Sequence, residues 1–185
     1  MVAFNFAPSL KYVRSDEGGN DDDKDDPGGR TSRGIIQREY DAWRKSNGLP
    51  TRDVWTATDN EIDAIYHDQY WEPWCDGFPL GLDYLFFDMD VNMGQHEAIL
   101  LLQRGLGVKA DGKIGIITQS ALKSCNAGEV IDAITAAKST FYHQLRTWWK
   151  FGKGWTARYL RAAQRAKAML LPAAPGSATN TAKGT

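Results

Sequence analysis

Apolar side chains recur at spacings of three and four residues along most of this 185-residue chain. That spacing places side chains on one face of an α-helix, whereas a half-buried strand needs strict alternation. The pattern predicts helices over residues 7–17, 35–47, 58–72, 82–89, 96–106, 116–124, 129–147 and 156–171. Only the Asp-rich segment up to Thr31 is typical of a short β-hairpin. The sequence therefore predicts a mainly α (α+β) fold, a helical bundle with one small β-hairpin.

The first predicted helix ends at a carboxylate on its apolar face. Leu10 and Val13 lie seven and four positions before Glu17, so the three side chains share one stripe. Gly18 and Gly19 follow and end the helix. Partial burial and the negative end of the helix dipole both disfavour a charged carboxylate there, which predicts a raised pKa. Such a protonated carboxyl group can act as the general acid in glycosidic bond cleavage; the alternative is a solvated residue at a helix end.

The Asp-rich loop that follows holds five aspartates within six residues. Asp21, Asp23 and Asp25 alternate as the first ligands of an EF-hand loop would. The sixth position is Asp26 instead of glycine, however, and the twelfth is Ser32 instead of glutamate, so the pattern does not fit an EF-hand. Like charges at this density repel one another, and we expect most of these aspartates to be solvated.

Asp26 and Thr31 differ from the rest of the loop because the turn DPGGRT fixes their position relative to Glu17. This arrangement offers a general acid on one side and a residue that orients water on the other, which suits hydrolysis of a sugar acetal. The three histidines show no metal-ligand spacing with one another or with the two cysteines. Neither a GxSxG motif nor a phosphate-binding glycine loop is present. We therefore expect no metal and no cofactor.

Several motifs in a fixed order carry a family resemblance, namely EGG, DPGG.T..GI, IY..QYW and LD..FFD..VN.G. They resemble glycoside hydrolase family 108, the N-acetylmuramidase type of bacteriophage endolysin. The later motifs LLQRGLGVKADGKIG..T..AL and FYHQL…F..GW resemble the peptidoglycan-binding region that accompanies this family. Together the motifs span residues 5–165. The resemblance implies a lysozyme-like fold with Glu17 as the catalytic glutamate, and with Asp26 and Thr31 holding the attacking water.

Two features depart from the family pattern, and both lie in the expected substrate loop. Asn20 stands where an aromatic residue usually follows the EGG motif. The Asp-rich insert DDDKD is also unusual for the family. Neither change removes a group that the chemistry needs, so the expected reaction is the same.

Aromatic and amide side chains are the candidates for binding sugar rings. Three aromatic residues gather where the third predicted helix stops before a proline, namely Tyr70, Trp71 and Trp74. Exposed rings there could stack on sugars, whereas core packing is the alternative for the two tryptophans. Asn92 and Gln95, farther along the chain, are predicted as further substrate-binding residues.

Asp88 interrupts an apolar run, FFDMDV, one helical turn before Asn92. A carboxylate in such a run is either part of the substrate groove or a buried polar group with its own partners. We interpret Asp88 as buried and tied to backbone amides.

Charge is divided between the two halves of the chain, although the total is only −1. Residues 1–90 carry a net charge of −10 and residues 91–185 a net charge of +9. Eight basic residues and no acidic ones occur from Lys138 to Lys167. Because a basic surface attracts polyanions, we expect these helices to bind anionic cell-envelope polymers, with lipopolysaccharide and anionic lipid as further candidates. A solvated helix face and attraction between the acidic and basic halves of the chain are the alternatives. Nucleic acid is not an expected partner.

Length and composition fit a compact enzyme that is expected to be a monomer. We predict a catalytic region over residues 1–92 and a helical peptidoglycan-binding lobe over 93–171, packed into one lysozyme-like unit. The small, polar residues 172–185 are expected to form a disordered tail. Two cysteines, Cys75 and Cys125, are too few for a disulfide scaffold and are interpreted as free buried thiols made in a reducing cytosol.

The expected location follows from the N-terminus and from the hydropathy of the chain. No apolar run approaches the length of a membrane span. The first residues lack the basic region and the long apolar stretch of a signal peptide. We therefore expect synthesis in the cytoplasm of a host bacterium and action in the periplasm or cell wall after release, for example through a holin pore.

These features together predict a peptidoglycan hydrolase, an endolysin that causes cell lysis. It would cleave the β-1,4 bond between N-acetylmuramic acid and N-acetylglucosamine in peptidoglycan glycan strands, with Glu17 as the general acid. A lytic transglycosylase or a chitinase on the same fold is one alternative. A non-catalytic cell-wall binding module or a membrane-disrupting module is another. The set EGG…DPGG…T favours an enzyme, because a pure binding module does not need it.

Overall fold

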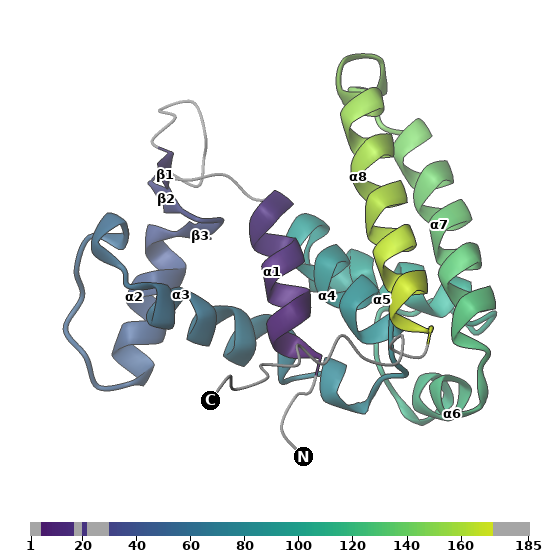
Figure 1. Ribbon diagram of the computed structural model, residues 1–185, viewed down its shortest axis with the longest axis horizontal. Coiled ribbons are helices and arrows are strands. Elements are labelled where there is room, and N and C mark those ends of the chain that lie inside the picture. The colour runs from purple at the N-terminus through teal and green to yellow at the C-terminus, as the bar shows by residue number, and fades with distance from the viewer. Residues whose placement is uncertain (1–4, 17–19, 22–29, 172–185) are drawn as a thin grey trace, which may run out of the picture.

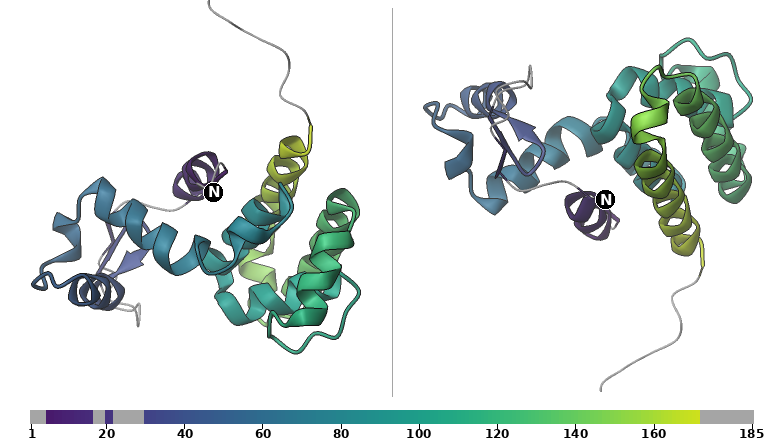
Figure 2. Two further views of the ribbon diagram at one scale, coloured as in Figure 1. Left: turned by 90° about the horizontal axis from the view of Figure 1, so that it is seen from below. Right: turned by 90° about the horizontal axis from the view of Figure 1, so that it is seen from above.

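The computed structural model describes residues 5–16, 20–21 and 30–171, so Glu17 and Asp26 lie outside the described residues. Two lobes lie on either side of helix α1 (Phe6–Asp16), as Figures 1 and 2 show. The smaller lobe contains three short strands and the helices α2 (Gln37–Ser46) and α3 (Asp59–Tyr66). The larger lobe contains α4 (Leu82–Met93), α5 (Gln95–Gly105), α6 (Ile116–Ser124), α7 (Ala127–His143) and α8 (Trp148–Met169). This arrangement confirms the predicted mainly α, lysozyme-like fold class.

Helix α1 forms along the predicted apolar stripe. Leu10 and Val13 are buried, and Val13 is fully inaccessible to solvent. Phe6, at the start of the helix, contacts the rings of Trp71 and Phe87 at centroid distances of 5.4 and 6.1 Å. The stripe therefore attaches α1 to the core beside α4, as the spacing of its apolar residues predicts.

The small sheet contains one strand more than the sequence pattern predicts. Strands β1 (Asn20–Asp21), β2 (Thr31–Ser32) and β3 (Ile35–Ile36) pair antiparallel in that order. The two residues between β2 and β3, Arg33 and Gly34, both have positive φ, which is the geometry of a tight two-residue hairpin. Because this turn reverses the chain, Ile35 and Ile36 form a strand, and the predicted helix over 35–47 begins only at Gln37.

Helix α3 begins as predicted and then changes its pitch. Thr58 caps its N-terminus, and the side chain of Glu61 reaches back to the Thr58 backbone in a complete capping box. The last part of the predicted helix, η2 (His67–Trp71), is a π-helical turn. Two 3₁₀ turns, η1 (Val54–Thr56) and η3 (Cys75–Gly77), lie before and after this segment.

Helix α4 lies at the centre of the larger lobe. Its residues from Leu82 to Asp90 are all buried, and it packs against α1, α5, α7 and α8. One hydrophobic core cluster joins residues of α1, α3, α4, α5, α7 and α8. The boundary at residues 92 and 93 stays a prediction, but the two predicted regions share this core.

Helices α7 and α8 form a long antiparallel hairpin, and their bounds differ from the prediction. The helix predicted over 129–147 ends at His143, and the helix predicted over 156–171 begins eight residues earlier, at Trp148. The glycine-containing run WWKFGKGW is helical, and its tryptophans Trp148 and Trp155 contact His143 and Tyr142 at the end of α7. A Cβ atom on Gly152 would lie 2.6 Å from the Trp148 ring, so the ring lies directly against that glycine.

Asp88 is fully buried, but the expectation that backbone amides hold it is wrong. Its carboxylate lies 3.7 Å from Lys138 Nζ on α7 and 3.8 Å from Arg158 Nη2 on α8. Neither carboxylate oxygen accepts a hydrogen bond. Inside a helix the backbone amides already bond to the preceding turn, so the partners of Asp88 come from other helices. Burial lowers the pKa of Lys138, and the charge of Asp88 opposes that shift.

Asp90 is a second buried acid on α4, and burial raises its pKa to about 7. In the unfolded chain this carboxyl ionises near its ordinary pKa of 3.8. Between these values the folded protein keeps a proton that the unfolded chain has released. Stability should therefore fall as the pH rises from about 4 to about 7 and then level off.

Asp90→Asn should remove the free-energy cost of ionising this buried carboxyl and stabilise the protein above pH 7 by roughly 4 kcal/mol, with little gain near pH 4. Thermal or urea unfolding at both pH values measures the difference. Asp132→Asn, at a carboxylate that is 66% exposed, is the matched control and should change stability little at either pH. A gain from Asp90→Asn that is equal at both pH values would contradict the assignment.

Two further sequence predictions concern the cysteines and membrane-spanning helices. Both cysteines are free thiols, as predicted; Cys75 is also buried as predicted, whereas Cys125 is only half-buried. In the described part of the chain, no helix combines the length and the apolar character needed to cross a membrane.

Candidate active site

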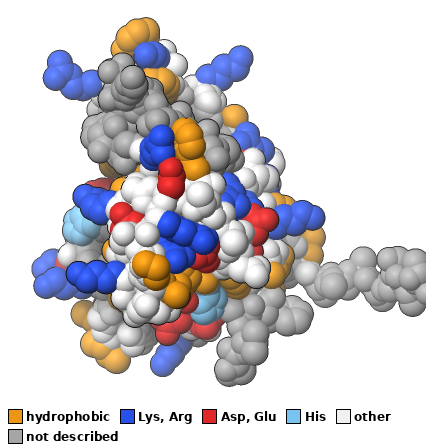
Figure 3. Space-filling model, turned by 90° about the vertical axis from the view of Figure 1, so that its left-hand side faces the viewer, with side chains coloured by type: hydrophobic (Ala, Val, Ile, Leu, Met, Phe, Trp, Pro, Cys, Tyr) orange, Lys and Arg blue, Asp and Glu red, His pale blue; other side chains and the backbone are white. Residues whose placement is uncertain are grey.

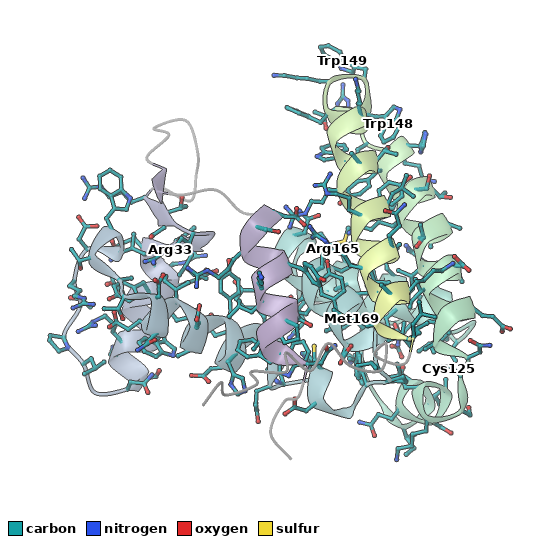
Figure 4. The ribbon with its side chains drawn as sticks, viewed as in Figure 1. Arg33, Cys125, Trp148, Trp149, Arg165 and Met169 are labelled. Carbon is teal, nitrogen blue, oxygen red and sulfur yellow. The ribbon has the colours of Figure 1, made fainter. Side chains whose placement is uncertain are left out.

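The C-terminal end of α1 is attached to α8 by ion pairs. The carboxylate of Asp16 is only 7% exposed, and its two oxygens lie 2.5 Å from Arg165 Nη1 and 3.3 Å from Arg161 Nη2. The Arg165 guanidinium also lies over the ring of Tyr12, 4.6 Å from its centroid (Figure 4). Arg161 and Arg165 are four residues apart, so they share one face of α8. These contacts fix the end of α1 immediately before Glu17, which lies outside the described residues.

A second set of ion pairs connects α1 to the smaller lobe. Arg14 contacts Asp59 at 2.8 Å and Asp63 at 2.7 Å, both on α3. Asp59 also pairs with Arg33, in the turn between β2 and β3, at 2.5 Å. The hydrogen bond from Arg14, together with its charge and that of Arg33, lowers the pKa of Asp59. Asp59 therefore stays ionised into the acidic range, and its pairs with Arg14 and Arg33 hold α1, α3 and the sheet together.

Thr31 lies on β2 in the smaller lobe and is half-buried. Its carbonyl oxygen accepts a hydrogen bond from the indole N–H of Trp55 at 3.0 Å. The Trp55 ring is 38% exposed, and the guanidinium of Arg30 lies 4.4 Å from its centroid. Thr31 is thus held by the strand pairing and by Trp55. Whether Asp26 lies beside it stays a prediction, because Asp26 is outside the described residues.

Trp55 is a candidate site residue that the sequence analysis did not single out. The same is true of Asp16, Arg161 and Arg165, which we call the Asp16 cluster. Trp55 is a lone aromatic residue in the polar segment TRDVWTATD, and that isolation was an available signal. The spacing of Arg161 and Arg165 on one helix face was another. Neither signal identifies which residue the side chain contacts, because Thr31 and Asp16 are more than 20 residues away in sequence from Trp55 and from the two arginines.

The predicted sugar-binding residues do not gather at one place. Trp71 is 1% exposed, and its indole N–H donates to Asp76 at 2.6 Å, so the prediction that its ring stacks on sugar is wrong. Tyr70 is half-buried against the core, with its ring 5.8 Å from that of Tyr66. Asn92 accepts a hydrogen bond from the Tyr142 hydroxyl at 2.8 Å, on the α7 side of α4. Gln95 is exposed at the first residue of α5.

Trp74 is half-buried and lines a pocket of about 270 Å³ between η3 and α6. Phe78, Ile114 and Leu122 supply most of the apolar wall, and Lys123 lies at its edge. The role of Trp74 in binding sugar stays a prediction, and the pocket is separate from the Asp16 cluster.

No group of three His, Cys, Asp or Glu residues that could hold a metal ion comes together in the segments that the structure describes.

Arg165→Ala should weaken the attachment of α1. It leaves the poorly exposed Asp16 carboxylate with only the longer pair to Arg161, so the free energy of unfolding should fall by about 1–2 kcal/mol. If the pair also positions the residue after Asp16, kcat on peptidoglycan should fall about tenfold while KM changes little.

Thermal unfolding and initial rates at several substrate concentrations measure the two effects. Arg104→Ala, at an exposed arginine on α5, is the matched control and should leave both unchanged. A loss of stability with an unchanged kcat would show that the Asp16–Arg165 pair has only a structural role.

Comparison with known proteins identifies the family. Residues 10–94 match the family described as Glycosyl hydrolase 108, and residues 97–160 match the one described as Predicted Peptidoglycan domain. The solved structure of Brucella abortus SagA is 34% identical to this chain, with a TM-score of 0.78, and the match covers 91% of this chain and 97% of that one. None of the curated proteins compared with the chain matches it. The chain is therefore a peptidoglycan-acting glycoside hydrolase, and it belongs to the glycosyl hydrolase 108 family.

Proposed function

We propose that this protein is an N-acetylmuramidase that cleaves the β-1,4 bond between N-acetylmuramic acid and N-acetylglucosamine. Glu17 is the general acid that protonates the glycosidic oxygen. Asp26 or Thr31 orients the water that attacks the anomeric carbon as the oxocarbenium-like transition state forms. In this role the protein is an endolysin that causes bacterial lysis.

The observation that carries this proposal is the attachment of the C-terminal end of α1. The helix ends at Asp16, and its apolar stripe of Leu10 and Val13 is buried as the sequence predicts. Asp16 is held by two arginines of the larger lobe, while Arg14, two residues earlier, is held by α3 of the smaller lobe. Glu17 is the next residue in the sequence after Asp16, and α1, which ends at Asp16, joins the two lobes. A general acid needs such fixed placement, because proton transfer depends on distance and angle.

The second side of the proposed site comes from the smaller lobe. Thr31 is fixed by the sheet and by Trp55, so its position relative to α1 depends on the Arg14, Asp59 and Arg33 network. The half-exposed Trp55 ring beside Thr31 offers an apolar face to a sugar. We therefore add Trp55 to the proposed substrate-binding residues.

Mass spectrometry of the soluble fragments released from purified peptidoglycan tests the bond that is cleaved. Fragments should be reduced with borohydride first, which labels each reducing end. Ends that carry reduced N-acetylmuramic acid are the expected result. Reduced N-acetylglucosamine ends would instead show a glucosaminidase, and 1,6-anhydro ends would show a lytic transglycosylase.

Chitin oligosaccharides are the matched control substrate, because they share the β-1,4 linkage but lack the lactyl and peptide groups. We expect no more than slow cleavage of chitin. Rates on chitin equal to those on peptidoglycan would favour the chitinase alternative over the muramidase.

A further inference from the structure

The hairpin of α7 and α8 ends in a tip that extends past the other described helices (Figure 1). Trp148 and Trp149 lie at this end of the molecule, as Figure 4 shows. We use the name hairpin tip for five exposed residues around the start of α8, namely Arg146, Trp149, Lys150, Phe151 and Lys153.

The aromatic residues near the tip divide into packed and exposed ones. Trp148 lies against His143, with ring centroids 3.8 Å apart, and Trp155 stacks on Tyr142 at 5.1 Å. Trp149, in contrast, is 84% exposed, more than any other large hydrophobic residue that the structure describes, and Phe151 is 44% exposed. Phe151 keeps one contact with the hairpin, because its ring centroid lies 5.6 Å from that of Trp155. Packing within the hairpin therefore accounts for Trp148 and Trp155, whereas Trp149 is left in water and Phe151 is partly exposed.

All charged residues of the hairpin tip are basic. No Asp or Glu occurs after Asp132 in the sequence. Arg146, Lys150 and Lys153 are all exposed, and Lys150 Nζ lies 4.9 Å from the centroid of the Phe151 ring. Figure 3 shows hydrophobic side chains at this end of the molecule with Lys and Arg side chains near them. The tip thus presents apolar rings with cations next to them.

We propose that the hairpin tip docks onto the surface of a bilayer that contains anionic phospholipid. Trp rings prefer the interface between the acyl chains and the headgroups, and Lys and Arg can keep their charges at the phosphates while their stems cover apolar surface. A protruding, convex tip suits insertion into such an interface. A glycan strand is the less suitable partner, because ligand sites are usually concave. This inference does not depend on the role of Glu17 or on the bond that the enzyme cleaves.

Co-sedimentation of the full-length protein with vesicles tests the proposal. We expect binding to phosphatidylcholine vesicles that contain phosphatidylglycerol, weak binding to pure phosphatidylcholine, and weakening by salt. Each basic residue near an anionic surface strengthens partitioning roughly fivefold, so Lys150→Glu should lower the partition coefficient about 30-fold. Trp149→Ala should lower it about tenfold. Trp149→Phe should reduce the blue shift of tryptophan emission that accompanies binding.

Two variants elsewhere on the surface serve as matched controls. Ile116→Ala removes an apolar side chain on α6 that is 79% exposed, and Lys109→Glu reverses an exposed charge. Both should bind vesicles like the wild type, and all variants should keep the wild-type melting temperature because the changed side chains are exposed. Wild-type protein that stays in the supernatant with anionic vesicles, or tip variants that sediment like the wild type, would overturn the proposal. Tip-dependent binding to lipid-free sacculi without vesicle binding would overturn it too and assign the tip to the glycan.

Discussion

Glu17→Gln should lower the rate of peptidoglycan hydrolysis by a factor of about 10²–10⁴. The substitution keeps the size of the side chain and removes only the proton that the leaving oxygen needs. Release of soluble fragments from purified peptidoglycan, followed over time at matched protein concentrations, measures this loss. Circular dichroism and the melting temperature should be close to those of the wild type, because the substitution is isosteric.

Glu72→Gln is the matched control for this experiment, because Glu72 is an exposed glutamate at the end of the π-helical turn. It should hydrolyse peptidoglycan at the wild-type rate. Activity of Glu17→Gln within tenfold of the wild type would mean that the general acid is another residue. Failure of the prediction for Glu17→Gln would leave the family membership unchanged, since that membership rests on the sequence and on the fold.

Lys138→Met should destabilise the fold by about 3–5 kcal/mol, the largest stability effect that we expect. Lys138 is 2% exposed and faces Asp88, whose carboxylate is fully buried and accepts no hydrogen bond. Removal of the ammonium leaves that carboxylate with Arg158 alone, at 3.8 Å. Urea unfolding at neutral pH measures the change in free energy.

Two further variants separate the buried charge from the side-chain volume. The double variant Asp88→Leu, Lys138→Met removes both charges and should recover most of the stability, because a buried ion pair contributes little beyond a packed apolar pair. Lys167→Met removes a surface partner of Asp132, with side chains 45% and 66% exposed, and should cost at most about 1 kcal/mol. A cost of less than about 1 kcal/mol for Lys138→Met would show that Asp88 is adequately neutralised without it.

Local features of the fold could be predicted well from the sequence. The buried stripe of α1 and the start of the third predicted helix at Thr58 both depend on residues within about seven positions, and both form as predicted. The β2–β3 hairpin was missed because the apolar pair Ile35 and Ile36 fits the spacing of the following helix equally well. Only the left-handed turn at Arg33 and Gly34 decides between strand and helix there.

The candidate site could be predicted only in part, for a related reason. Thr31 lies on the predicted β element, whereas Glu17 and Asp26 are outside the described residues and keep the roles proposed above. Trp71 was misread because an aromatic residue at a helix end is equally compatible with a surface and with a core position. Trp55 was overlooked because its contact with Thr31 joins residues 24 positions apart.

From the amino-acid sequence we could predict the helical class, the apolar face of α1, the order of the motifs that mark the family and the basic character of the last two helices. These properties depend on residue type and on short-range spacing. The tertiary structure alone decided which partners meet: Asp16 with Arg161 and Arg165, Asp88 with Lys138, and Trp149 with solvent. The physical reason is that a charged or aromatic side chain can be satisfied by many partners, and only the packing of distant helices selects one of them.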